Sequence, residues 1–418
     1  MSERVVIIGA SHGAAQACAS LRQLGWEGGI ALVSEEPHLP YHRPPLSKAY
    51  MSGEQGMDDI LIRPPEAYEQ MDMELHLGMR AESIDRAAKT VRLSDGTEVD
   101  YTKLILATGA RVRKIPVPGA ELDGVFYLRD QADALSIQER VKAGADKAVV
   151  IGGGYIGLEV AASLRKQGLK VTVIEAMERI LERVTTPEMS AFIRRIHAEE
   201  GVRIVEGASV TAVRETGSGL AVVTGTRTYS ADIVVVGIGV IPNTELASEA
   251  GLAVGEGREA GIRVDAHART TDPDIYAIGD VAWHYSPIYD RHMRVESVPN
   301  ATEMAKTAAA HIVLDAKGEG DAAKDYSALP WFWSDQFDLK LQIAGLSDGA
   351  TESVVRGSLD EGRSVAVFHF DDGRLLAVDA VNDPRSFMFA KMMIPKGAKL
   401  DKGIVRDVEA DLKSAVRG

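Results

Sequence analysis

The sequence predicts an α/β protein with two Rossmann-type dinucleotide-binding domains and a smaller α+β domain towards its C-terminal end. Two stretches, Val5 to Glu35 and Ala148 to Ala176, carry most of this prediction. Each reads as a strand, a glycine-rich turn, a helix, a second strand and an acid. The segment after Asp325 reads differently, as alternating strands followed by short helices, and it predicts the third domain.

The central stretch has the full G-x-G-x-x-G spacing. Ala148 to Ile151 is a short apolar run typical of a buried parallel strand, and Gly152, Gly154 and Gly157 follow it. The first glycine permits a tight turn, the second lets the backbone approach a pyrophosphate, and the third allows close packing of helix on strand. Glu159 to Gln167 reads as the helix of this unit.

An acid completes the central unit. Val171 to Ile174 reads as the next strand, and Glu175 closes it, where a carboxylate accepts hydrogen bonds from the hydroxyls of an adenosine ribose. A bare glycine motif is weak evidence, because glycine turns of other origin match it. The complete series of strand, glycines, helix, strand and acid indicates a dinucleotide site.

The N-terminal stretch repeats this theme in altered form. Its turn is Gly9-Ala10-Ser11-His12-Gly13-Ala14, in which Ser11 replaces the second glycine and Ala14 the third. Glu35 follows the next strand at the ribose position. Alone, this turn could be an ordinary loop; beside a second fingerprint it predicts a second dinucleotide.

A stiff loop follows at Pro40 to Lys48, where prolines exclude a regular strand, or a helix start before Leu46. It could be a solvated proline loop. Its position soon after a ribose acid suggests instead that Arg43 and Lys48 are cations for a pyrophosphate and a reactive ring.

Further strands end in small residues. Glu74 to Ile84 and Lys89 to Leu93 read as alternating strands, and Tyr101 to Ala110 reads as a buried strand ending in Ala-Thr-Gly. Thr270 to Asp280 finishes on Gly-Asp, where the carboxylate is either a solvated strand end or a partner for ribityl hydroxyls. Small residues let the backbone approach a ligand at the carboxyl ends of a sheet.

The remaining landmarks are a helix and a boundary. Asn300 to Ile312 is an alanine-rich helix, and the polar run Lys317 to Asp325 marks a domain boundary. Beyond it, the aromatic run Trp331 to Gln336 predicts a packed interface or a ligand lid. Helices are expected near Arg385 to Met393 and from Ile404.

Charge, hydropathy and cysteine content limit the classes of protein to which the chain can belong. The net charge of −14 argues against binding nucleic-acid phosphates. No apolar run reaches the roughly 18 residues of a membrane span. The N-terminus passes from Met1 to Arg4 into a strand without a signal-peptide pattern, so we expect no membrane association and a cytoplasmic location. The one cysteine, Cys18, reads as a buried helix residue, and no Cys/His cluster predicts a metal site.

Five motifs together give the chain a family resemblance. It resembles the two-dinucleotide, glutathione-reductase-like flavoprotein reductases that carry FAD in one Rossmann-type domain and NAD(P)H in another inserted into it. Within them it is similar to the putidaredoxin reductase-like ferredoxin reductases of cytochrome P450 and ring-hydroxylating dioxygenase systems. The motifs are PPLSK at 44–48, ATGAR at 107–111, GGGYIGLE at 152–159, YAIGD at 276–280 and PWFWSDQ at 330–336.

The resemblance implies a domain layout and a set of site residues. FAD would bind in 1–112 and 245–322, NADH in 113–244, and 323–418 would form a C-terminal interface domain. Lys48 and Glu159 would be catalytic, paired near the nicotinamide side of the flavin. The implied cofactor-binding residues are Gly9, Ser11, His12, Gly13, Ala14, Glu35, Arg43, Lys48, Ala81, Thr108, Gly109, Arg129, Gly279, Asp280, Val298 and Trp331 for FAD, and Gly152, Gly154, Tyr155, Ile156, Gly157 and Glu175 for NADH.

The function that the resemblance implies is an NADH-dependent ferredoxin reductase. Such an enzyme takes a hydride from NADH onto FAD and passes single electrons to a 2Fe–2S ferredoxin. Of three alternative functions, two stay open. An NADH oxidase or disulfide reductase needs a redox cysteine after the proline loop, and the chain has none after Cys18. The other two are a rubredoxin reductase and a nicotinamide-sensing protein resembling apoptosis-inducing factor.

The last predictions from the sequence concern the partners of the chain. The segment Arg385 to Arg406 holds six basic residues and one acid, Asp401, against the acidic whole. It is either a solvated segment or the docking patch for an acidic ferredoxin. Glu175 predicts a preference for NADH over NADPH. We expect a monomer or weak dimer.

Overall fold

The computed structural model describes residues 3–417, which divide into two compact units. Unit 1 comprises 1–43, 57–111 and 241–330, and unit 2 comprises 44–56, 112–240 and 331–418. The chain passes between them after residues 43, 56, 111, 240 and 330. Two of these passages lie in β8 (Ala110–Val112) and β17 (Val240–Pro242), which pair as a two-stranded sheet. The predicted boundaries of three domains stay a prediction.

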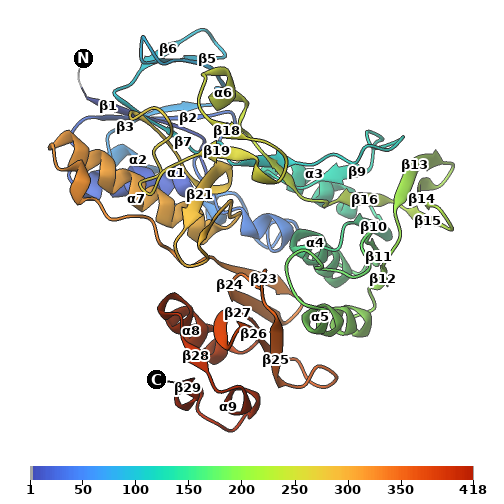
Figure 1. The fold of residues 1–418 in the computed structure, drawn as a ribbon. Helices are drawn as coiled ribbons and strands as arrows, with labels where there is room; N and C mark the ends of the chain where they lie inside the picture. The colour runs from blue at the N-terminus through green and yellow to red at the C-terminus, as the bar shows by residue number, and fades with distance from the viewer. Residues whose placement is uncertain (1–2, 418) are drawn as a thin grey trace. The chain divides into compact units, whose positions relative to one another are not determined.

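Unit 1 is built on a parallel five-stranded sheet in the order β20-β7-β1-β2-β3. Val5, Val6 and Ile7 of β1 are fully inaccessible to solvent, as the central strand of such a sheet requires. Helices α1 and α7 pack side by side (Figure 1). The elements are β1 (Arg4–Ile8), α1 (His12–Gln23), β2 (Gly29–Ser34), α2 (Pro65–Gln70), β3 (Met73–Leu77), β7 (Lys103–Leu106), β20 (Ile275–Ala277) and α7 (Val298–Ala316).

An antiparallel sheet, a mixed sheet and several short helices complete unit 1. One sheet has the order β4-β5-β6 and the other β18-β19-β21-β22, in which β19 and β21 are parallel. Their bounds are β4 (Ala81–Asp85), β5 (Thr90–Leu93), β6 (Glu98–Asp100), β18 (Val254–Gly255), β19 (Gly261–Arg263), β21 (Ala282–Ser286) and β22 (Arg291–Met293), with helices η2 (Asp58–Ile60), α6 (Glu245–Glu249), η3 (Gly257–Glu259), η4 (Gly279–Val281) and η5 (Gly320–Ala322).

Unit 2 contains a second parallel sheet of five strands, in the order β12-β11-β10-β16-β9. The chain between β12 and β16 forms an antiparallel sheet of three strands, β13-β14-β15. The elements are η1 (Pro44–Ser47), β9 (Val125–Tyr127), α3 (Gln131–Lys142), β10 (Lys147–Ile151), α4 (Tyr155–Lys166), β11 (Lys170–Ile174), α5 (Pro187–Glu199), β12 (Arg203–Val205), β13 (Val210–Thr216), β14 (Gly219–Thr224), β15 (Thr228–Ala231) and β16 (Ile233–Val236).

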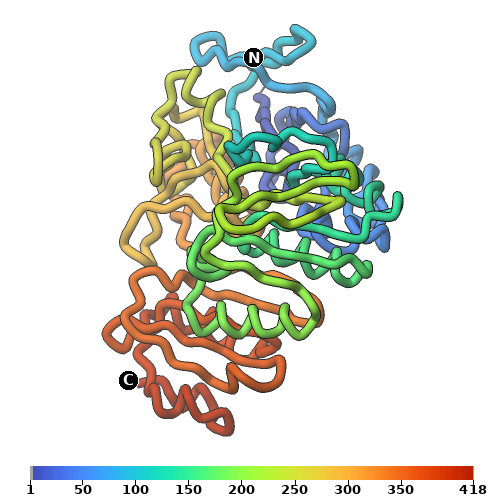
Figure 2. Tube along the Cα trace, turned by 90° about the vertical axis from the view of Figure 1, so that its right-hand side faces the viewer, coloured from blue at the N-terminus to red at the C-terminus, as the bar shows by residue number. Residues whose placement is uncertain are grey.

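The C-terminal part of unit 2 is a mostly antiparallel sheet of seven strands, with α8 packed on β24 and β27. Helix α5 lies beside this sheet (Figure 2), where Arg363 forms an ion pair with Glu200 at 2.5 Å. The elements are β23 (Trp331–Gln336), β24 (Leu339–Gly345), β25 (Glu352–Gly357), β26 (Val365–Asp371), β27 (Arg374–Val381), α8 (Pro384–Met393), η6 (Ile394–Lys396), β28 (Lys399–Leu400), α9 (Lys402–Arg406), η7 (Leu412–Ala415) and β29 (Val416–Arg417).

The predicted fold class is confirmed, with local corrections. The stretch Glu74 to Ile84 is two strands of different sheets, because the chain turns at Gly78 with a φ of +73°. A 3₁₀ turn begins at Pro44, earlier than Leu46, since proline's fixed φ suits a first helical turn. Helix α4 begins at Tyr155, directly after its N-cap Gly154, whereas the sequence predicted Glu159.

Two further observations bear on the composition. Cys18 is buried in α1, as predicted, and burial raises the pKa of its thiol to about 12. Within residues 3–417, no helix combines the length and the apolar character needed to cross a membrane.

Candidate functional site

The turn between β1 and α1 in unit 1 has the geometry of a phosphate-binding turn. Gly9 has a φ of +108°, and a Cβ on it would lie 2.2 Å from the carbonyl oxygen of Ala107. Only glycine fits there. Ser11 is the N-cap of the 12-residue helix α1, so the unpaired N–H groups of the first helical turn follow it. Such a helix start attracts a pyrophosphate.

Two predicted FAD residues, one in this turn and one in the proline loop, contact side chains of the loop and its surroundings. His12 is buried, and its Nε2 lies 3.1 Å from Nδ1 of His42. Burial lowers the pKa of His42, which favours an uncharged ring in this pair. Arg43 forms an ion pair with Glu36, and the hydroxyl of Tyr41 also donates to Glu36. The predicted cation Arg43 therefore also neutralises a neighbouring acid.

Most of the other predicted FAD residues of unit 1 follow the carboxyl ends of the parallel strands β1, β2, β7 and β20 along the chain. Gly13 and Gly279 both face Ala301, at the start of α7. The hydroxyl of Thr108 donates to the carbonyl of Asn243 at 2.8 Å. Glu35 is exposed just beyond β2. The remaining members lie at the ends or starts of elements of this unit: Ala14 in α1, Ala81 in β4, Gly109 after β7, Asp280 in η4 and Val298 in α7.

The turn between β10 and α4 in unit 2 repeats this geometry. Gly152 has a φ of +109°, and its Cβ would lie 2.3 Å from the carbonyl oxygen of Gly237. A Cβ on Gly157 would lie 2.1 Å from the carbonyl oxygen of Gly152. Around Gly154, the N-cap of α4, a Cβ would meet nothing within 4 Å. That open space suits the close approach of a pyrophosphate, so the residues present fit a dinucleotide.

Glu175 is fixed beside this turn. Its carboxylate accepts hydrogen bonds from the backbone N–H groups of Gly153 at 2.6 Å and Met177 at 2.8 Å. Arg179 is turned into its own loop, since it donates to Ser190 at 2.6 Å and to the carbonyl of Glu182 at 3.2 Å. A carboxylate fixed in this way suits ribose hydroxyls and opposes a 2′-phosphate, and the guanidinium of Arg179 is held by Ser190 and Glu182 instead of being free to bind that phosphate.

The two other predicted NADH residues are the first residues of α4. Burial raises the pKa of Tyr155, whose hydroxyl has no hydrogen-bond partner within residues 3–417. Ile156 is 48% exposed, which is unusual for so large an apolar side chain.

Lys48 and Glu159 form an ion pair in unit 2, as the resemblance implied. Lys48 Nζ lies 2.6 Å from Glu159 Oε2, and the hydroxyl of Ser47 donates to the same oxygen at 2.5 Å. Glu159 is only 4% exposed. Its other oxygen accepts a hydrogen bond from Ser334 at 2.7 Å. Three donors thus hold the carboxylate: Ser47 of η1, Lys48 directly after η1, and Ser334 of β23.

Four members of this cluster were not predicted from the sequence: Ser47, Ser334, Gln336 and His197. Ser47 was visible within PPLSK, and Ser334 and Gln336 within PWFWSDQ. The available signal was a polar end on an otherwise aromatic strand. Nothing in the sequence around His197 indicated a buried histidine on α5 within reach of Gln336.

Three residues that the resemblance assigned to FAD, namely Lys48, Arg129 and Trp331, lie in unit 2. Trp331 belongs to an aromatic cluster in which its ring centroid lies 5.5 Å from that of Trp333 and 5.7 Å from that of Phe387. Lys391 Nζ lies 4.4 Å from the Trp331 centroid, a cation–π contact.

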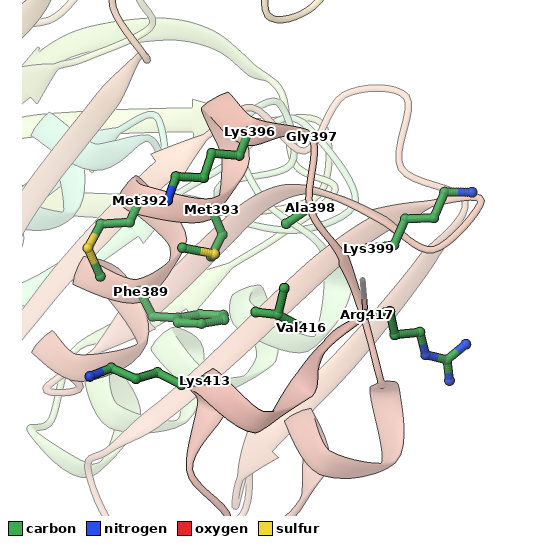
Figure 3. A pocket seen from close by; sticks show the side chains of 10 residues that line it. All are labelled: Phe389, Met392, Met393, Lys396, Gly397, Ala398, Lys399, Lys413, Val416 and Arg417. Carbon is green, nitrogen blue, oxygen red and sulfur yellow. The ribbon is translucent and has the colours of Figure 1, made fainter.

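A groove of about 820 Å³ lies on the C-terminal part of unit 2. Phe389, Met393 and Val416 line it together with four basic residues, Lys396, Lys399, Lys413 and Arg417. Figure 3 shows Lys396 and Lys413 pointing to the same side as Met392, with Lys399 and Arg417 pointing to the other. Lys399 also pairs with Asp372 at 3.1 Å. The predicted basic segment therefore supplies part of a larger surface that is both basic and apolar.

Comparisons with known proteins agree along the whole chain. The family model described as pyridine nucleotide-disulphide oxidoreductase matches residues 3–305, and the one described as reductase C-terminal matches 331–416. Rhodocoxin reductase of Rhodococcus erythropolis is 42% identical, covering 99% of this chain and 94% of that one. Putidaredoxin reductase CamA of Pseudomonas putida is 40% identical, covering 99% and 97%.

Solved structures of ferredoxin reductases also match the chain over nearly its whole length. The chain matches the covalent putidaredoxin reductase–putidaredoxin complex with a TM-score of 0.92 and 40% identity, covering 99% of this chain and 98% of that one. It matches the ferredoxin reductase for the CYP199A2 system from Rhodopseudomonas palustris with a TM-score of 0.93 and 41% identity, covering 99% and 100%.

Proposed function

Since the chain belongs to the pyridine nucleotide-disulphide oxidoreductase family and resembles its ferredoxin reductases along its whole length, we propose that it is an NADH-dependent reductase of a 2Fe–2S ferredoxin. It takes a hydride from NADH onto FAD and passes single electrons to the ferredoxin of a cytochrome P450 or related oxygenase. The observation that carries this proposal is the pair of phosphate-binding turns, one in each unit, in one chain.

Each part of the chain has a role in this reaction. FAD, when bound, supplies the conversion between a two-electron hydride and single electrons. The Gly9 turn and the start of α1 bind its pyrophosphate, and the Gly152 turn and Glu175 bind NADH. Lys48 supplies positive charge where hydride transfer leaves negative charge, and Glu159 holds Lys48 in place. The protein needs no general acid or base.

The roles of Lys48 and Glu159 are tested by replacing each of them. Lys48→Ala and Glu159→Gln should each slow flavin reduction by NADH by about 100-fold in stopped-flow experiments, because both disturb a group placed at the reaction. FAD content, measured from the flavin absorbance after purification, should match the parent protein. Unchanged reduction rates in both variants would show that the pair is only structural.

Steady-state assays with NADH separate the candidate functions. Cytochrome c reduction should depend on added 2Fe–2S ferredoxin, whereas a nicotinamide-sensing protein would reduce acceptors slowly with or without it. A rubredoxin-NAD(+) reductase of Pseudomonas putida is 37% identical over 91% of this chain, so rubredoxin is the matched alternative carrier. Faster turnover with rubredoxin than with every 2Fe–2S ferredoxin would reassign the partner.

We place ferredoxin docking on the basic groove of unit 2. Its cations suit an acidic partner despite the net charge of −14, and its Met and Phe side chains offer apolar contact. Reversing Lys396 and Lys399 to Glu should raise the KM for ferredoxin about tenfold at low salt. Ferricyanide reduction by NADH should be unaffected. A parent-like KM would move the docking site elsewhere.

The remaining partner predictions need their own measurements. A monomer or weak dimer is tested by sedimentation over a range of protein concentrations. The cytoplasmic location and the lack of membrane or nucleic-acid binding are tested by cell fractionation and by retention on lipid and DNA supports.

A further inference from the structure

A buried chain of hydrogen bonds connects Glu159 with helix α5 through the C-terminal strand β23. Ser334 donates to Glu159 Oε1 at 2.7 Å, and Gln336 Nε2 donates to the Ser334 hydroxyl oxygen at 3.0 Å. Gln336 Oε1 lies 2.8 Å from Nε2 of His197. All four side chains are buried and belong to unit 2. The chain therefore uses the polar end of PWFWSDQ, to which the reaction described above gives no role.

The donors in this chain all point the same way. The Ser334 hydroxyl donates to the carboxylate, so its oxygen is left to accept from the amide nitrogen of Gln336. The amide oxygen of Gln336 then faces His197, which must donate from Nε2. Burial lowers the pKa of His197 to about 4, so its ring is neutral at pH 7. Its Nδ1 then carries only a lone pair, and it has no hydrogen-bond partner within residues 3–417.

The direction of these hydrogen bonds determines how the carboxylate of Glu159 is held. A neutral His197 with its proton on Nε2 fixes the amide of Gln336, which fixes the hydroxyl of Ser334. The result is one hydrogen-bond donor aimed at Glu159 Oε1, opposite the two that Lys48 and Ser47 aim at Oε2. A buried carboxylate held from both sides keeps one rotamer, and so keeps the ammonium of Lys48 at one position.

We propose that Ser334, Gln336 and His197 are positioning residues for hydride transfer, acting through Glu159 on Lys48. The C-terminal strand that carries Trp331 and Trp333 thereby also sets the geometry of the Lys48–Glu159 pair. This inference rests on the catalytic role proposed for that pair. A purely structural role would predict effects on stability alone.

Ser334→Ala is the direct test. It removes one charge-assisted hydrogen bond from Glu159 and should slow flavin reduction by NADH about tenfold. The Kd for NADH, obtained from the saturation of that rate, should stay within about twofold, since no nucleotide contact is removed. Ser334→Thr keeps the hydroxyl and should restore the rate to within about threefold of the parent value.

Two more variants extend and control the test. Gln336→Met removes the support behind Ser334 at similar volume, and it should slow reduction by a smaller factor in the same direction. Ser163→Ala removes a buried hydroxyl from α4 one turn beyond Glu159, and Ser163 belongs to no part of this network. It should leave the rate unchanged. Thermal unfolding and FAD content of each variant report whether the fold is intact.

The outcomes separate this inference from the proposed function. A folded Ser334→Ala protein with the parent rate would overturn the inference, and so would a Ser334→Thr protein as slow as Ser334→Ala. A change in the Kd for NADH that accounts for the whole loss would also overturn it. If Lys48→Ala and Glu159→Gln themselves reduced FAD at the parent rate, the catalytic role of the pair would fail instead. For Glu159→Gln, the flavin absorbance spectrum provides a readout that does not depend on turnover.

Discussion

The two glycine turns of this protein are alike in backbone conformation at the first two positions of the fingerprint and differ in the space available at the third. Gly9 and Gly152 have almost the same φ, +108° and +109°, and each would drive a Cβ into a backbone carbonyl. At the second position Ser11 and Gly154 are both N-caps with negative φ, of −127° and −80°. At the third position Gly157 has no room for a Cβ, whereas Ala14 fits fully buried.

This comparison shows which glycine of the fingerprint the backbone itself requires. The first is required in both turns by conformation and by close contact. The second is required in neither by conformation, so a serine there alters only the room for a ligand. The N-terminal turn, which is altered as a motif, therefore keeps the geometry of a phosphate-binding turn.

The largest expected effect comes from breaking each turn separately. Gly9→Ala should abolish FAD retention, because a Cβ would overlap the Ala107 carbonyl at a positive φ. Gly152→Ala should retain FAD, yet need at least about 100-fold more NADH for half-maximal reduction, since its strain lies in the other unit. Flavin absorbance and stopped-flow titration measure the two effects. Loss of FAD from both variants, or from neither, would contradict the assignment of one nucleotide to each turn.

Substitutions of the two acids at the ribose positions should have unequal effects on the preference for NADH over NADPH. Glu175 is held by two backbone N–H groups, whereas Glu35 is exposed and forms no hydrogen bond within residues 3–417. Glu175→Ser should shift the ratio of kcat/KM for NADH over NADPH about tenfold towards NADPH. Glu35→Ser, the matched control, should leave that ratio unchanged and weaken FAD binding. The same ratio in the parent and in Glu175→Ser would remove Glu175 from the NADH site.

Acidification should loosen unit 1 more than unit 2. Burial lowers the pKa of His284 and of His311 in unit 1, and that of His197 in unit 2; for His284 and His197 the value falls from 6.5 to about 4. Stability from keeping these rings neutral is present above pH 6.5 and is lost as the pH falls towards about 4. Hydrogen exchange at pH 7 and pH 5 should show the larger loss of protection in unit 1. An equal or larger loss in unit 2 would contradict this.

Ser11→Gly should have the smallest effect. The φ of Ser11 suits any residue, so restoring the missing glycine should change the Kd for FAD by no more than about twofold. Fluorescence titration of apoprotein with FAD measures it. A tenfold tighter Kd would mean that the serine side chain does obstruct the pyrophosphate.

These regions also show how far the sequence could predict the molecule. Both turns and their acids follow from local spacing, whereas the pairing of Lys48 with Glu159, which are 111 residues apart in the chain, was implied only by the family resemblance. Ser334, Gln336 and His197 could not be found in this way, because their contacts depend on the packing of β23 and α5, which are distant in sequence from one another and from Glu159. The 3₁₀ turn at Pro44 was missed since prolines that break a strand also start a helical turn.

An anaerobic electron count is the most direct test of electron transfer from NADH through FAD to a 2Fe–2S ferredoxin. The FAD-loaded protein is reduced with one equivalent of NADH and then mixed with excess oxidised 2Fe–2S ferredoxin. The account predicts that two ferredoxins are reduced for each NADH and that the flavin returns to its oxidised spectrum, because a hydride carries two electrons and each cluster accepts one. Flavin that is reduced by NADH but stays reduced, beside ferredoxin that stays oxidised, would contradict it.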